Sequence, residues 1–82
     1  MLDYKKILKE TKFDDVKIKT WNSKTQHEIE ILGNKKGLLY LASRLAEFVF
    51  EDYDTLGEFD LHAGIELTDD SSWLRIFKCE KL

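Results

Sequence analysis

Hydrophobic and polar residues alternate along this chain with two different periods, and each period predicts one type of secondary structure. Alternation at every second residue, as in Val16, Ile18 and Thr20, is typical of a strand with one buried face. Apolar residues three and four positions apart indicate a helix. In chain order we expect a helix over residues 3–11, a hairpin of strands over 16–21 and 28–31, a helix over 34–50, and strands over 58–62 and 72–79.

The longest periodic segment begins at Asn34, a residue type that commonly caps helix N-termini. Gly33 precedes it and is expected to let the chain leave the strand at a positive φ angle. Ser43, Arg44 and Glu47 fall on one side of the predicted helix, which we expect to face solvent. The opposite, apolar side is predicted to cover the core and consists of Leu38, Leu41, Ala42, Leu45, Ala46 and Val49.

The α-β-β-α-β-β order predicts an α+β fold with a four-stranded, mainly antiparallel sheet, one main helix and a short N-terminal helix. The chain contains no proline and no linker-like run, so we expect residues 1–82 to form a single domain. Alternation assigns one sheet face to the helices, namely Val16, Ile18, Ile29, Ile31, Phe59, Leu61, Leu74 and Ile76. The outer face then receives Lys17, Lys19, Trp21, Glu28, Glu30, Asp60, His62, Trp73, Arg75 and Phe77.

Three aromatic residues on this expected outer face, Trp21, Trp73 and Phe77, suit the recognition of another protein. Aromatic side chains and arginine are the residue types enriched in interface cores and binding hot spots. Two other arrangements would hide these rings. The N-terminal helix or a second subunit would cover the outer face, or Trp73 would belong to the core.

Charge is unevenly distributed along the chain. Residues 1–50 carry ten Lys and Arg against seven Asp and Glu, whereas residues 51–82 carry three against nine. This acidic half argues against nucleic acid as a partner, because nucleic-acid binding needs a basic track. It favours a positively charged protein surface, although a solvated acidic stretch that only aids solubility would look the same. The acids that we expect to contact a partner are Glu51, Asp52, Asp54, Glu58 and Asp60.

The turn from Gly33 to Gly37 suggests a second binding feature. Asn34, Lys35 and Lys36 lie where a helix begins, and free backbone N–H groups beside two lysines can hold an anion. A tight strand-to-helix connection explains the same residues without any ligand. The predicted helix is nevertheless charged against its dipole, with lysines in its first turn and acids at its end, and a partner that neutralises either end would remove this cost.

Catalytic and metal-binding patterns are weak in this sequence. His27 and His62 accompany Glu28, Glu30 and Asp60, but their spacing matches no established metal or acid–base motif. A single cysteine, Cys79, excludes an intramolecular disulfide and a cysteine-based zinc finger. We therefore expect no cofactor, no metal and no catalysis, with a histidine–carboxylate metal-dependent enzyme as the least favoured alternative.

No apolar run approaches the roughly 20 residues that cross a bilayer, and the first residues contain no signal-peptide core. We therefore expect an intracellular protein that does not bind membranes.

The segment Ile31-Leu-Gly-Asn-Lys-Lys-Gly-Leu-Leu-Tyr-Leu-Ala42, together with the leucine-rich helix that it begins, resembles the bacterial immunity protein family numbered thirty-two. The likeness covers roughly residues 28–80 and includes a strand that ends in His62. The resemblance implies a non-enzymatic cytoplasmic protein of a polymorphic toxin system, which binds and neutralises a cognate protein toxin. The chief rival hypothesis is a small homodimeric structural or regulatory module whose outer sheet faces pair across a two-fold axis.

Overall fold

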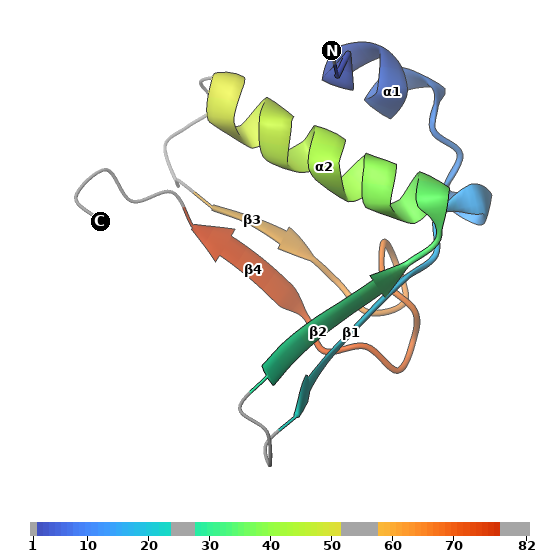
Figure 1. Cartoon of the computed structure of the whole chain (residues 1–82), viewed down its shortest axis with the longest axis vertical. Coiled ribbons are helices and arrows are strands. Elements are labelled where there is room, and N and C mark those ends of the chain that lie inside the picture. The colour runs from blue at the N-terminus through green and yellow to red at the C-terminus, as the bar shows by residue number, and fades with distance from the viewer. Residues whose placement is uncertain (1, 24–27, 52–57, 78–82) are drawn as a thin grey trace.

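The computed structural model describes residues 2–23, 28–51 and 58–77, and it forms helices and strands in the predicted order (Figure 1). Within these residues, no helix is long and apolar enough to cross a membrane. The elements are α1 (Tyr4–Glu10), a short 3-10 helix (Phe13–Asp15), β1 (Ile18–Ser23), β2 (Glu28–Gly33), α2 (Lys35–Phe50), β3 (Glu58–Leu61) and β4 (Leu74–Phe77).

The prediction of one four-stranded sheet is wrong, although the α+β class is confirmed. The strands form two separate antiparallel hairpins, β1 with β2 and β3 with β4. The loop before β4 takes the free edge of β1, because Thr68 N donates to Ile18 O at 2.9 Å and Ser72 N donates to Thr20 O at 3.0 Å. These bonds occupy the edge groups of β1 that β4 would need, so the two hairpins meet at this loop and then diverge (Figure 1).

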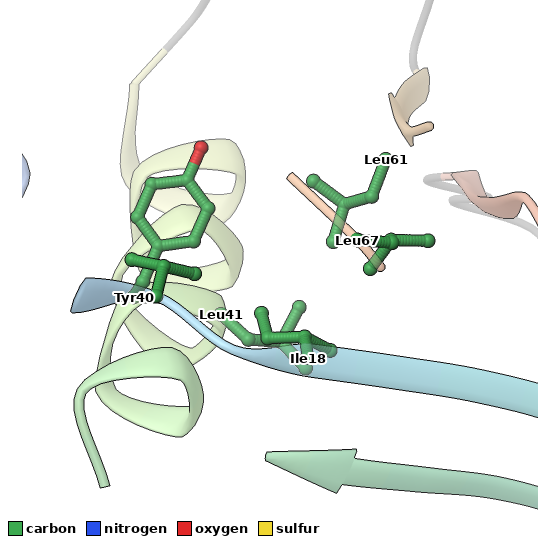
Figure 2. Packing of buried hydrophobic residues seen from close by; sticks show 6 residues of the cluster. Ile18, Tyr40, Leu41, Leu61 and Leu67 are labelled. Carbon is green, nitrogen blue, oxygen red and sulfur yellow. The ribbon is translucent and has the colours of Figure 1, made fainter. Parts of the chain in front are cut away.

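The core lies where α2 crosses the strands. Its buried apolar residues are Val16, Ile18, Tyr40, Leu41, Leu61 and Leu67, with Leu8, Phe59 and Leu74 packed against them. Figure 2 shows Tyr40 and Leu41 of α2 together with Ile18 of β1, and Leu61 and Leu67 beyond them. The predicted strand phase is therefore confirmed for Ile18, Leu61 and Leu74.

The phase of β2 is also as predicted, but the burial of its apolar residues is not. Thr20 is buried and pairs with Ile31, so both residues point to the helix side of the first hairpin. Ile31 is nevertheless exposed, and Ile29 is 74% exposed. The reason is that the free end of this hairpin projects away from α2, as Figure 1 shows, so the helix covers only the end of β2 at Gly33.

The predicted buried side of α2 is also wrong, except at Leu41, which is buried as predicted. Leu38, Leu45 and Val49 are exposed, whereas Ser43, expected in solvent, is fully buried. Helix α2 lies between α1 and the strands (Figure 1). The buried residues of α2 are therefore Gly37, Tyr40, Leu41 and Ser43, and most of its leucine-rich side is exposed.

The start of α2 is held against the beginning of β1 by Asn34. The Asn34 side-chain oxygen accepts from Gly37 N at 2.7 Å and from Lys17 N at 3.2 Å, and its amide nitrogen donates to Asp15 O at 2.9 Å. The predicted cap is confirmed. Among the glycines that the structure describes, the one with a positive φ is Gly64, at 84°, and not Gly33 as predicted.

Candidate functional site

The outer face of the β3–β4 hairpin gathers four side chains that we call the outer-face cluster: Asp60, His62, Trp73 and Arg75. Asp60 is paired with Arg75 and Leu61 with Leu74; His62 directly follows β3, and Trp73 directly precedes β4. Arg75 Nε lies 3.6 Å from Asp60 Oδ1, and His62 Nε2 lies 3.8 Å from Asp60 Oδ2. The His62 ring stacks on the Trp73 indole with 4.2 Å between centroids. Alternation brings these residues together because each occupies an outward position.

Two of the predicted aromatic anchors are open to solvent. Trp73 is 60% exposed and Phe77 is 62% exposed. Phe77 pairs with Glu58 across the hairpin, so this predicted acid lies beside a predicted anchor. Within the described residues neither α1 nor the core covers the two rings, which removes the alternatives that hid them inside the chain.

The third predicted anchor, Trp21, lies across a hollow from Trp73. The hollow measures about 300 Å³ and opens where β1 and β4 diverge; it is lined by Thr20, Trp21, Asn22, Ile29, Ser72, Trp73, Leu74 and Arg75. Lys19 Nζ lies 5.6 Å from the centroid of Trp21 and 2.6 Å from a carboxylate oxygen of Asp70. The failure of the two hairpins to join in one sheet therefore creates a recess between two tryptophans.

The predicted acidic residues do not form one patch among the described residues. Glu51 closes α2 and contacts α1, where it accepts a hydrogen bond from the Tyr4 hydroxyl at 3.2 Å and pairs with Lys5 at 3.2 Å. Burial and this bond to Glu51 raise the pKa of Tyr4. Asp60 belongs to the outer-face cluster, and Asp52 and Asp54 lie outside the described residues. The structure thus brings together Asp60, Glu58, Trp73 and Phe77, with Trp21 across the hollow.

Asp60 is the member of the cluster with an unpaired hydrogen-bond acceptor. Its Oδ1 atom is buried and has no hydrogen-bond partner among the described residues. The 3.6 Å approach of Arg75 is too long for a hydrogen bond, although it supplies an opposite charge. Arg75 therefore balances the charge of this carboxylate without completing its hydrogen bonds.

The described residues contain no group of three His, Cys, Asp or Glu side chains that could hold a metal ion. His27 and Cys79 lie outside the described residues. Asp60 and His62 are adjacent, but the stacking of His62 on Trp73 gives that histidine a packing role. The arrangement as a whole offers aromatic surface, one carboxylate and one guanidinium, which are groups that bind proteins.

The anion site at Asn34, Lys35 and Lys36 stays a prediction. Asn34 points its oxygen at the first-turn N–H of Gly37, so the side chain already satisfies a group that an anion would use. Lys36 lies 3.6 Å from Asp15. These contacts fit the tight strand-to-helix connection that was the simpler explanation of this segment.

Sequence reasoning placed all four members of the outer-face cluster on one face, but it did not pair them. It missed the contact between Lys19 and Asp70, since those residues are far apart in the chain and no local pattern joins them. Comparisons with protein-family models, curated proteins and solved structures find no match.

Proposed function

We propose that this chain is an immunity protein that binds a cognate bacterial protein toxin and neutralises it by occlusion, without catalysis, in the cytoplasm of the producing cell. The observation that carries the proposal is the exposed pair of aromatic rings, Trp73 and Phe77, on a sheet face that also presents Asp60 and Arg75. The segment around Gly33–Leu38 resembles immunity proteins of the family numbered thirty-two, and this resemblance suggests that the partner is a protein toxin.

The outer face has the composition of a binding hot spot. Exposed Trp and Phe side chains lose solvent on binding, and burying each ring removes roughly 150–250 Å² from water. Arg75, whose side chain is 60% exposed beside Asp60, offers a guanidinium to a carbonyl or carboxylate group of the toxin. Glu58, which pairs with Phe77, would add negative charge to this face. The other acids of the expected set, Glu51, Asp52 and Asp54, would raise the overall negative potential that a basic toxin surface meets.

The test uses the toxin domain encoded next to the gene for this chain. The purified pair is titrated by calorimetry, and bacteria expressing the toxin domain are scored for growth with each variant. Trp73→Ala and Phe77→Ala should each weaken binding at least tenfold and reduce protection, whereas Ile65→Ala, which alters a similarly exposed apolar residue outside the outer-face cluster, should leave both unchanged. Asp52→Lys combined with Asp54→Lys should slow association and flatten its dependence on salt.

Two results would count against different parts of the proposal. Absence of both binding and protection by the unaltered chain would remove the toxin as partner. Full protection by the Trp73 and Phe77 variants would keep the function but place the interface on another face.

A further inference from the structure

The hollow between the two hairpins begins where the loop before β4 stops pairing with β1. Thr68 N donates to Ile18 O and Ser72 N donates to Thr20 O, so this loop follows β1 in the same direction. In a regular parallel ladder, Ser72 O would next accept from the backbone N–H of Asn22. It accepts from the Thr20 hydroxyl instead, and β4 then diverges from β1 (Figure 1).

Beyond this point β1 has an unpaired stretch of strand edge at Asn22. Thr20 directs its backbone groups away from β2, with its N–H donating to Ser71 Oγ at 3.2 Å and its C=O accepting from Ser72 N. These directions alternate along an antiparallel strand, so Asn22, two residues later, directs its N–H and C=O to the same side. Asn22 is exposed, and across this edge its backbone makes no hydrogen bond within the part of the chain that the structure describes. Such an edge is a template for a further strand.

The second strand beside the hollow is β4. Its partner β3 lies on one side, and the hollow of about 300 Å³ lies on the other. Side chains from both faces of the hairpins line this space, with Trp21 and Trp73 on the outer face and Ile29 and Leu74 on the helix side. Backbone edges in the middle, with side chains on both faces, are the surroundings of a strand within a sheet. The hollow therefore has the lining of a missing strand.

The lining also indicates the chemistry of an occupant. Both walls are mainly apolar, so successive side chains of an entering strand would meet apolar surface on either face. The charged residue among those that line the hollow is Arg75, which offers its guanidinium to a carbonyl or carboxylate. Lys19, beside Trp21, is already paired with Asp70 at 2.6 Å. These properties fit an extended apolar peptide better than a charged or compact ligand.

We propose that an extended apolar segment of the toxin enters this hollow and adds to the edge of β1 at Asn22. The inference rests on the proposed function, because it takes the toxin as the partner. Trp73 and Arg75 line the hollow and also belong to the outer-face cluster, so one bound molecule reaches both. In this mode of recognition, backbone hydrogen bonds to the strand edge supply affinity, and side-chain contacts on the two faces supply specificity.

The first test blocks the edge of β1. Asn22→Pro removes the N–H that points to the hollow but no hydrogen bond within the first hairpin, so the fold should persist. In a calorimetric titration with the toxin domain encoded next to the gene, this variant should raise the dissociation constant at least tenfold. Ile31→Pro is the matched control, because Ile31 pairs with Thr20 and so directs its N–H to the outer edge of β2. It should change the constant less than twofold, and circular dichroism should show both variants folded.

Two further measurements do not depend on a proline in a strand. Toxin binding should slow hydrogen exchange of the Asn22 amide in the unaltered chain at least tenfold and leave the Ile31 amide unchanged. Ile29→Lys places a charge on the helix-side wall of the hollow and should weaken binding at least fivefold. Ile65→Lys makes the same change outside the hollow, at a residue that is 66% exposed against 74% for Ile29, and should have no effect.

The possible failures of this inference and of the proposed function are distinct. Toxin binding with unchanged exchange at Asn22 and full affinity of Asn22→Pro would overturn the inference and leave the proposed function in place. Absence of toxin binding by the unaltered chain would overturn both. Self-association of the unaltered chain in light scattering that is lost with Asn22→Pro would also overturn the inference, because the added strand would then come from a second copy.

Discussion

At the scale of single residues, the loop from Thr68 to Ser72 is held together by its own side chains. Thr68 Oγ1 donates to Asp70 at 2.7 Å and lies 2.8 Å from Ser71 Oγ. Lys19 of β1 then pairs with Asp70 at 2.6 Å. These contacts give the loop the shape in which it lies along β1, and they give Asp70 a role that differs from the partner steering expected of acids in this part of the chain.

The Asp70 contacts predict a dependence of stability on pH. Hydrogen bonds from Lys19 and from Thr68 lower the pKa of the Asp70 carboxyl below its usual value of 3.8. The lowered pKa means that the folded state binds this proton less readily than the unfolded state, so the contribution to stability is present above pH 3.8 and is lost as the pH falls through the folded-state pKa. Carboxyl NMR should find Asp70 titrating below the usual range, and Lys19→Met should move the value upward. Titration unchanged by that substitution would contradict the ion pair.

At the scale of elements, the placement of α2 depends on how closely its first turn approaches β1. A Cβ on Gly37 would lie 2.5 Å from Lys17 O and 2.9 Å from Ile18 Cγ1. The backbone oxygen cannot move without shifting β1, so glycine is required here for space rather than for an unusual backbone angle. Together with the Asn34 cap, this contact fixes the angle at which the helix leaves the first hairpin.

Gly37→Ala should therefore destabilise the protein, even though alanine is the better helix former. We expect a loss of about 1–3 kcal/mol in the free energy of unfolding, measured by urea denaturation, because the start of α2 must separate from β1. Gly33→Ala is the matched control. Its Cβ would meet mainly the Leu38 side chain, which is exposed and can turn aside, so its effect should be smaller. Equal losses for the two variants would contradict this explanation.

At the scale of the whole molecule, Thr20 joins the two hairpins. It is 2% exposed, its hydroxyl donates to Ser72 O, its N–H donates to Ser71 Oγ at 3.2 Å, and its carbonyl accepts from Ser72 N at 3.0 Å. The same residue thus satisfies the edge of β1 and fixes where the hollow between Trp21 and Trp73 begins. The recess on the candidate binding face depends on this junction.

Thr20→Val keeps the shape of the side chain but removes the hydroxyl donor. We expect a loss of about 1–2 kcal/mol in thermal or urea unfolding, together with faster hydrogen exchange of the Ser72 amide, because the junction between the hairpins loosens. Thr11→Val also removes a hydroxyl that donates to a backbone carbonyl, but it does so at the end of α1, which buries no residue, so it should cost less. Unchanged exchange at Ser72 would show that the hydroxyl does not hold the hairpins together.

Much of the local structure could be predicted from the sequence. Alternation located the strands and their phase, so that Ile18 and Leu61 are buried and Trp73 and Phe77 are exposed. Helical spacing and Asn34 located the start of α2. These features follow from neighbouring residues, whose side-chain directions are set by the backbone period alone. The outer-face cluster could be placed on one face for the same reason.

The arrangement of the elements could not be predicted in this way. The leucine-rich side of α2 looked like the core side because periodicity reports an apolar face without saying what covers it, and here neither α1 nor the strands do. The single sheet failed because backbone N–H and C=O groups bind whichever segment reaches them, and the Thr68–Ser72 loop reached the edge of β1. Periodicity and capping are local properties that the sequence determines by itself. Edge pairing, helix rotation and the recess between the tryptophans are contacts between distant segments, and only the packed chain decides among them.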